Sequence, residues 1–111
     1  MKIAIIGSRN LTIDNIENYL PDETTEIVSG GAKGIDRCAE KYAREHGLKL
    51  TVFLPEYNKY GKGAQLKRNL QIINYADEVI AFWDGTSKGT KYVIDQCEKI
   101  NKKITVCKLE V

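Results

Sequence analysis

The feature that most constrains the fold is the alternation of short apolar runs with longer amphipathic segments along the whole chain. Five runs have the length and aliphatic character of β-strands, at residues 2–6, 26–29, 49–54, 78–82 and 103–109. Four segments between them have apolar residues at helical spacing, at residues 12–20 and 35–46 and around residues 66–73 and 93–100. Strands that alternate with helices form a parallel sheet with helices on both faces. The pattern therefore predicts a single domain over residues 1–111, a three-layer α/β/α sandwich with a five-stranded parallel sheet.

The polarity of the strands predicts their order in the sheet. Residues 3–6 and 79–82 are continuously apolar, as expected of central strands that are covered on both faces. Residues 50–53 and 104–107 interleave polar with apolar side chains, which favours the edges. These patterns predict the order 3-2-1-4-5, with the first and fourth strands adjacent at the centre. In such open sheets, ligands bind in the crevice beyond the carboxyl ends of those two strands.

Small and polar residues gather in the three loops that we expect at this crevice. They are Gly7, Ser8 and Arg9 after the first strand, Ser29, Gly30, Gly31, Ala32, Lys33, Gly34 and Asp36 after the second, and Asp84, Gly85, Thr86, Ser87, Gly89 and Thr90 after the fourth. Open backbone N–H groups and the helix dipole make such helix N-termini attractive to anions. Hydroxyl groups of the third loop add donors, and Arg9, Lys33 and Arg68 supply countercharge. The loops therefore predict a phosphate or diphosphate ligand.

Each of these residues also has a purely structural interpretation. Glycines in such turns frequently serve only a positive φ or close helix packing. Asp36 suits a ribose hydroxyl and equally the first turn of a helix. Trp83 suits either stacking on a base or the core, and Arg68 either points into the crevice or is solvated. Tyr57 and Tyr60, in a loop expected to be mobile over the crevice, have ligand contact and loop packing as alternatives.

Charge, cysteine content and motifs limit the classes of function. Seventeen basic and fifteen acidic residues give a net charge of +2, too small to predict nucleic-acid binding, although residues 58–74 carry four cations and no carboxylate. Three cysteines without a CxxC pair predict neither a disulfide framework nor a zinc site. Neither GxGxxG after the first strand nor GxxxxGK[ST] is present, so the NAD-type and P-loop classes lack support. The apolar run at residues 3–6 is too short for a leader or a membrane span. We therefore expect a cytoplasmic protein without a metal, a cofactor or a membrane partner.

At these residues the chain resembles the SLOG superfamily, the Rossmann-like domains shared by DNA processing protein A and the LOG phosphoribohydrolases, and it looks most like the small stand-alone YspA-type members. Residues 29–36, SGGAKGID, resemble the SG(L/G)AxGID element of DNA processing proteins. Arg68-Asn69 followed by Ala76-Asp77 is similar to their RN…(S/A)D stretch, and residues 85–90, GTSKGT, to the GTSxGT phosphate loop. The resemblance covers essentially the whole chain. It implies a Rossmann-like fold and a nucleotide-derived ligand at these loops, with Asn69 added to the binding residues.

The resemblance leaves the enzymatic role open. LOG enzymes cleave an N-glycosidic bond with an arginine and with the glutamate of PGGxGTxxE. The alignment retains Arg68 at the arginine position, but it places Val93 at the glutamate position and residues 85–87 in place of PGG. Because the oxocarbenium-like transition state needs a nearby carboxylate, a hydrolase would have to use Asp36, Asp84 or Asp95 instead.

Three functions are compatible with these residues and with the resemblance, and we rank them in order of preference. The first is sensing or sequestration of a nucleotide-derived small molecule such as ADP-ribose, AMP or a related signalling nucleotide. The second is hydrolysis of a nucleoside phosphate or N-glycoside of the LOG type, with Arg68 as the catalytic residue. The third is single-stranded nucleic-acid binding of the DNA-processing-protein type. Because related domains are often dimeric, the resemblance also implies a homodimer.

Overall fold

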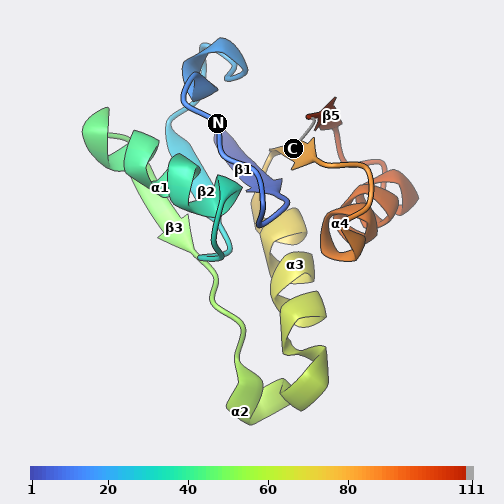
Figure 1. The fold of residues 1–111 in the computed structure, drawn as a ribbon. Helices are drawn as coiled ribbons and strands as arrows, with labels where there is room; N and C mark the ends of the chain where they lie inside the picture. Colours follow the sequence, from blue (N-terminus) through green and yellow to red (C-terminus); the bar gives the residue numbers. More distant parts are fainter. Residues whose placement is uncertain (110–111) are drawn as a thin grey trace.

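The computed structural model describes residues 1–109, which form one parallel sheet of five strands (Figure 1). The strands are β1 (Lys2–Gly7), β2 (Glu26–Ser29), β3 (Lys49–Val52), β4 (Glu78–Trp83) and β5 (Ile104–Lys108). The helices are α1 (Ile35–Glu45), α2 (Tyr57–Tyr60), α3 (Ala64–Tyr75) and α4 (Lys88–Lys99), with 3₁₀ turns η1 (Ile16–Asn18) and η2 (Gly61–Gly63). The order of the sheet is β3-β2-β1-β4-β5, and every pair is parallel. The predicted fold class and strand order are confirmed.

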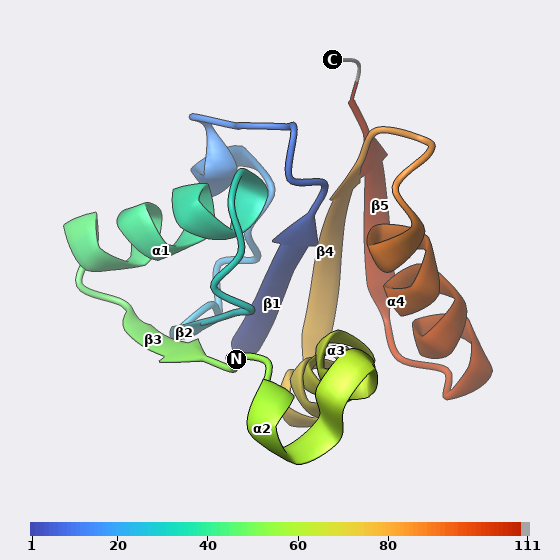
Figure 2. The same ribbon diagram turned by 60° about the horizontal axis from the view of Figure 1, so that its bottom comes forward.

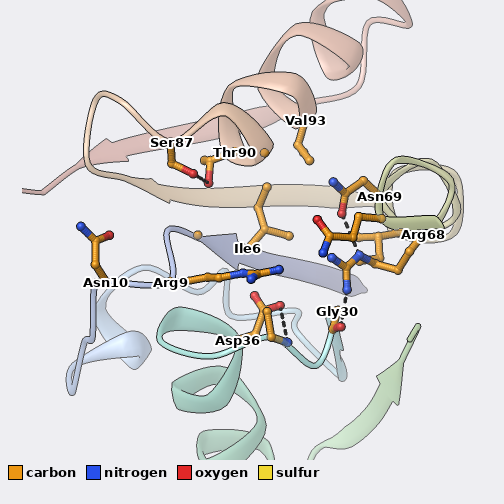
Figure 3. Close-up of a pocket in the computed structure, with 15 residues that line it drawn as sticks. Ile6, Arg9, Asn10, Gly30, Asp36, Arg68, Asn69, Ser87, Thr90 and Val93 are labelled. Atoms are coloured by element: carbon orange, nitrogen blue, oxygen red, sulfur yellow. Dashed lines mark hydrogen bonds between the residues drawn. The ribbon is translucent and has the colours of Figure 1, made fainter. Parts of the chain in front are cut away.

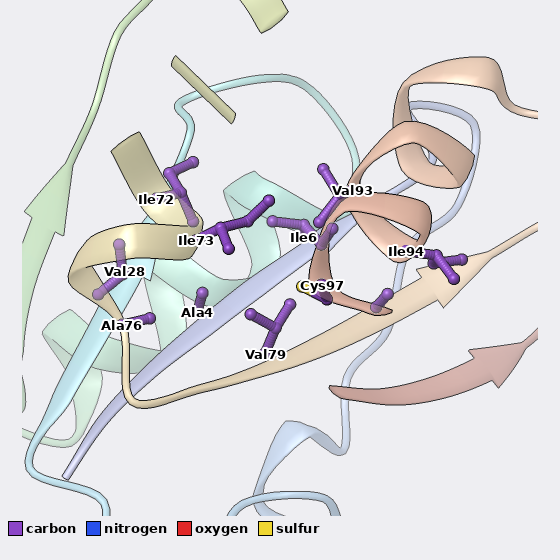
Figure 4. Close-up of a cluster of buried hydrophobic side chains, with 11 residues drawn as sticks. Ala4, Ile6, Val28, Ile72, Ile73, Ala76, Val79, Val93, Ile94 and Cys97 are labelled. Carbon is purple, nitrogen blue, oxygen red and sulfur yellow. The ribbon is translucent and has the colours of Figure 1, made fainter. Parts of the chain in front are cut away.

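The alternation of side chains along β1 divides the core into two layers. Ile3 and Ile5 lie in a buried cluster with residues of α1 and of the segment after β1. Ala4 and Ile6 point to the opposite face, where they pack with residues of α3 and α4 (Figure 4). Figure 2 shows the two groups of helices apart, with α1 on one side of the sheet and α3 and α4 together on the other. Residues 3–6 of this strand are all apolar because both of its faces are covered there.

The predicted helix over residues 12–20 is wrong: the structure has only the single 3₁₀ turn η1 there. The segment before this turn is rich in β-branched residues and in Asp and Asn, whose side chains favour caps and turns over helix interiors. Asn15, at the start of η1, makes no side-chain capping hydrogen bond. The apolar spacing nevertheless identified a buried residue, since Ile16 is only 2% exposed.

Smaller differences occur at the edge of the sheet and in the segment that follows it. β3 ends at Val52, two residues earlier than predicted, and Leu54 beyond it is 62% exposed. The segment around Tyr57 and Tyr60, predicted as a loop, contains α2 and η2. Among the helices of residues 1–109, none has the length and hydropathy needed to cross a membrane.

The reversal of the chain across the sheet determines where the predicted loops meet. β1 pairs with β2 on one side and with β4 on the other, in a register that runs from Ile3 opposite Glu78 to Gly7 opposite Phe82. The carboxyl ends of these three strands therefore lie side by side. The loops that lead from β2 into α1 and from β4 into α4 begin at this edge, which is where open α/β sheets bind their ligands.

Candidate functional site

A cavity of about 390 Å³ lies at the carboxyl ends of β1, β2 and β4 (Figure 3). Its wall contains residues from all three predicted loops and from α3. Ten of the predicted site residues line it, namely Gly7, Arg9, Gly30, Ala32, Asp36, Arg68, Asn69, Ser87, Gly89 and Thr90. Three apolar residues of the core, Ile6, Ile72 and Val93, also line it. The wall of the cavity thus combines polar and apolar surface.

Arg68 is oriented in this cavity by a neighbour on its own helix and by the loop after β2. Its side chain is buried, with the residue 7% exposed, so the solvated alternative does not apply. The Nε group donates a hydrogen bond to Asn69 Oδ1 at 2.8 Å, and Nη1 donates to the carbonyl oxygen of Gly30. Burial lowers the pKa of Arg68, the charge of nearby Arg9 lowers it further, and the carboxylate of Asp36 opposes both effects.

Arg9 and Arg68 place two positive charges in the wall of this cavity. Figure 3 shows both side chains reaching toward each other above Asp36. Like charges in a partly desolvated site repel, and an anion between them would relieve the repulsion. The pair therefore favours an anionic ligand.

Asp36 occupies the opposite wall, in the first turn of α1. It is 5% exposed, and its Oδ2 atom accepts a hydrogen bond from the backbone N–H of Ala32 at 3.1 Å. Burial raises the pKa of Asp36, and the hydrogen bond from Ala32 opposes this rise. A Cβ atom on Gly30 would lie 2.8 Å from Arg68 Nη1 and 3.1 Å from Asp36 Oδ2. Glycine at this position is what lets both side chains come this close.

The rest of the loop after β2 shapes the turn and does not line the cavity. Ser29 is buried beneath the turn, where its hydroxyl donates to Glu40 Oε2 at 2.8 Å and accepts from the N–H of Gly31 at 3.3 Å. Gly31 and Gly34 both have φ of +72°, which favours glycine. Lys33 is exposed and lies outside the cavity wall.

The loop after β4 is built around Asp84. Its Oδ1 atom accepts hydrogen bonds from the N–H groups of Thr86, at 2.9 Å, and Ser87, at 2.7 Å, and these bonds lower the pKa of Asp84. Ser8 supports the same residue, because its hydroxyl accepts from the Asp84 N–H at 3.2 Å. Asp84, Gly85 and Thr86 themselves do not line the cavity. They form the turn that brings the start of α4 to its rim.

The start of α4 contributes donors to the cavity. Ser87 is the N-cap residue, and its side chain makes no capping hydrogen bond. The Ser87 hydroxyl therefore does not pair with the first-turn N–H groups of α4. This hydroxyl lies 3.4 Å from that of Thr90, which is 5% exposed. Trp83 donates its ring N–H to the Ser87 carbonyl at 3.0 Å and packs against the core. Trp83 therefore anchors this loop and does not line the cavity.

Two polar lining residues, Asn10 and Gln65, were not predicted from the sequence. Asn10 directly follows Arg9, and Gln65 lies three residues before Arg68, a spacing that puts both on one face of α3. The hydroxyl of Tyr57 accepts a hydrogen bond from Gln65 Nε2 at 2.8 Å, and neither Tyr57 nor Tyr60 lines the cavity. The helical spacing from Arg68 is the pattern that could have identified Gln65.

The three carboxylates proposed to replace a missing glutamate are in different surroundings. Asp36 lines the cavity, Asp84 forms the turn before α4, and Asp95 pairs with Lys91 Nζ at 2.7 Å. Val93 lines the cavity as a buried apolar residue. Within residues 1–109, no group of three or more His, Cys, Asp or Glu side chains is arranged to hold a metal ion.

Comparison with known proteins bears on the first half of the chain. No curated protein and no solved structure matches the chain. A family model described as the YspA, cpYpsA-related SLOG family matches residues 1–60, more than half of the 111 residues. The matched part contains β1, β2 and the two loops that follow them, whereas Arg68 and the start of α4 lie outside it. From this match, the chain belongs to the YspA, cpYpsA-related SLOG family.

Proposed function

We propose that the protein binds a nucleotide-derived small molecule, such as AMP, ADP-ribose or a related signalling nucleotide, in the cavity at the carboxyl edge of the sheet. Membership of the SLOG family suggests nucleotide-related binding or processing. The observation that carries the proposal is the pairing of Arg9 and Arg68 with the start of α4 in one cavity. The protein would act as a sensing or sequestering domain.

A phosphate group suits the positive end of this cavity. Arg68 is already oriented by Gly30 and Asn69, so little side-chain freedom is lost when it binds an anion. Ser87 and Thr90 offer hydroxyl groups beside the first-turn N–H groups of α4. Guanidinium groups, hydroxyls and a helix N-terminus are the donors that proteins use for phosphate.

The remaining wall suits the uncharged part of a nucleotide. Ile6, Ile72 and Val93 provide apolar surface, while Asn69 and Gln65 add amide groups. Small-molecule sites combine an apolar lining with a few polar groups, and their volumes run from about 300 to 1,000 Å³. The cavity of about 390 Å³ falls within this range.

A nucleoside-phosphate or N-glycoside hydrolase is the second candidate, and Asp36 is the observation that favours it. A buried carboxyl group with a raised pKa, in the same cavity as an arginine, resembles the environment of a general acid. Against this, Val93 offers no second carboxylate. We expect AMP to be recovered intact after prolonged incubation. Free adenine detected by chromatography, at a rate that Arg68→Gln abolishes, would favour the hydrolase.

A thermal-shift screen tests binding directly. The panel contains AMP, ADP-ribose, cyclic ADP-ribose isomers, NAD and cyclic dinucleotides. A ligand at one hundred times its Kd stabilises the folded protein by about 2.7 kcal/mol, which gives a clear rise in Tm. If no member of the panel raises Tm, the proposed function is wrong.

Two matched threonine variants then locate the phosphate. Thr90→Val removes a hydroxyl from the cavity wall and keeps the branched shape, so the affinity for the nucleotide should fall about tenfold or more. Thr86→Val makes the same change on an exposed residue of the same loop that does not line the cavity, and it should leave the affinity unchanged. Calorimetric titration measures both. Equal effects of the two variants would contradict binding at the start of α4.

A further inference from the structure

Asp36 supplies the only carboxylate in the cavity wall within the described part of the chain. The groups around Asp36 differ in charge from those at the start of α4, which lines another part of the cavity. Arg68 and Arg9 both reach toward Asp36 (Figure 3), and the charge of Arg68 opposes the rise in the pKa of Asp36, whereas Glu40, also on α1, adds a negative charge that raises it. The start of α4 differs from this end of the cavity, because its lining residues Ser87, Gly89 and Thr90 offer hydrogen-bond donors and no carboxylate. Glu40 is itself nearly buried and is held by the Ser29 hydroxyl at 2.8 Å. A ligand with distinct anionic and hydrogen-bond-donating ends is therefore oriented by the cavity.

We propose that Asp36 accepts a hydrogen bond from a sugar hydroxyl of the ligand, so that the cavity selects ribonucleotides over deoxyribonucleotides. This inference rests on the proposed function and deepens it by naming the substrate class. The phosphate occupies the end with Ser87 and Thr90, because this part of the wall offers hydrogen-bond donors without a carboxylate, while Arg9 and Arg68 reach into the space between it and Asp36. The ribose, which carries hydroxyl donors next to the phosphate, then faces the carboxylate.

The fixed position of Asp36 makes it suited to selection. The Ala32 N–H holds Oδ2 at 3.1 Å, and the absence of a side chain at Gly30 lets the Arg68 guanidinium approach the same carboxylate. A buried acceptor that meets a deoxyribose loses its partner without regaining water. Sites that are built to hydrogen-bond a hydroxyl reject analogues that lack it for this reason.

Two variants distinguish selection from a structural role of Asp36. Asp36→Ala removes the acceptor, while Asp36→Asn keeps the size and one oxygen for the Ala32 N–H, so this variant should fold even if the alanine variant does not. Asp95→Asn is the matched control, since it makes the same change on a half-exposed carboxylate that pairs with Lys91 outside the cavity. Circular dichroism establishes that each variant is folded.

The probes are AMP, 2′-deoxy-AMP and 3′-deoxy-AMP, with affinities measured by calorimetric titration. We expect the wild-type protein and Asp95→Asn to bind AMP about tenfold or more tightly than at least one deoxy analogue. We expect the folded Asp36 variants to lose most of this preference. Equal wild-type affinities for the three probes, or a preference that persists in both Asp36 variants, would overturn the inference and leave the proposed function intact.

Absence of AMP binding also overturns the inference, because the adenosine ribose would then not reach Asp36. ADP-ribose titrated in the same experiment separates this result from failure of the proposed function. Binding of ADP-ribose without AMP would retain the proposed function, whereas binding of neither probe, together with a negative thermal-shift screen, would remove both.

Discussion

Gly30 shows how one residue can position a site by having no side chain. Its carbonyl accepts the hydrogen bond from Arg68, and the place of its absent Cβ is bordered by the Arg68 guanidinium and the Asp36 carboxylate. The glycine does not have a positive φ, so close approach and not backbone conformation explains it. Gly7 is different, because a Cβ there would lie 2.5 Å from Ile35 Cγ1 and 2.7 Å from the Phe82 carbonyl oxygen. Both glycines line the cavity, but Gly30 admits two polar side chains of the site, whereas Gly7 admits the close packing of Ile35 against the sheet.

This difference gives a matched pair of substitutions. In Gly30→Ala the nearest atom is the end of a flexible side chain, so Arg68 moves and the affinity for a nucleotide should fall about tenfold, the loss expected for one charge-assisted contact. The free energy of unfolding should change by about 1 kcal/mol or less. In Gly7→Ala the new methyl group meets backbone and a buried isoleucine, so stability should fall by about 1–3 kcal/mol. Urea denaturation and calorimetric titration check the pair. A Gly30→Ala protein with undiminished affinity would show that the position of Arg68 is irrelevant to binding.

The raised pKa of Asp36 predicts that the stability difference between the wild-type protein and Asp36→Asn depends on pH. Burial raises its pKa in the folded protein above the value in the unfolded chain, so the folded state binds more protons between the two values and loses stability as the pH rises through them. Asp36→Asn has no such group. The free energy of unfolding of Asp36→Asn relative to wild type should therefore increase from about pH 3 to pH 7, with the change beginning near the ordinary carboxyl pKa of about 3.9. Urea denaturation at several pH values measures it, and a decrease would mean that Arg68 and the Ala32 N–H outweigh burial.

At the scale of elements, the segment between β1 and β2 shows that residues can be buried without forming a regular helix. Ile16 packs into the cluster beneath α1 although the surrounding chain makes only the turn η1. Tyr19, just after the turn, contacts the Phe82 ring edge-to-face with centroids 5.0 Å apart. The apolar residues of this segment thus pack against the sheet, but the segment stays irregular because its local residue preferences oppose a regular helix.

A cavity-forming substitution tests this description. Ile16→Ala removes a side chain that is 2% exposed and should destabilise the protein by about 2–5 kcal/mol. Ile100→Ala, at a residue that is 51% exposed at the end of α4, should change stability by no more than about 0.5 kcal/mol. Thermal or urea denaturation compares them. Similar small losses would mean that the segment is not part of the core.

The sequence could predict which strands are central and which loops meet, because burial on both faces of β1 and β4 requires continuous apolar residues. It could not predict which loop residues face the cavity. Ser8 and Gly31 do not line the cavity, whereas Asn10 and Gln65 do. These outcomes depend on individual turn angles and side-chain hydrogen bonds, which short-range patterns do not determine. Arg68 was expected at the crevice because it falls early in the predicted third helix and matches the arginine of the resembling family, and its burial excludes the solvated alternative that the sequence left open.

At the scale of the whole molecule, Arg9 and the four cations of residues 58–74 fall into two separate groups. Arg9 and Arg68 lie in the cavity wall, whereas Lys59, Lys62 and Lys67 are exposed and outside it. The basic stretch at residues 58–74 is therefore not one continuous surface around Arg68, which weakens the nucleic-acid alternative. The homodimer stays a prediction, which analytical ultracentrifugation can check.

The central claim is that a nucleotide binds in the cavity at the carboxyl edge of β1, β2 and β4. The most direct measurement is a titration of the ¹⁵N-labelled protein with AMP and ADP-ribose, followed by amide chemical shifts. We predict that the largest changes fall on cavity residues after β2 and at the start of α4, such as Gly30, Ala32, Gly89 and Thr90, with little change in the separate groove between residues 12–16 and α1. No response to either nucleotide, or changes confined to that groove, would contradict the claim.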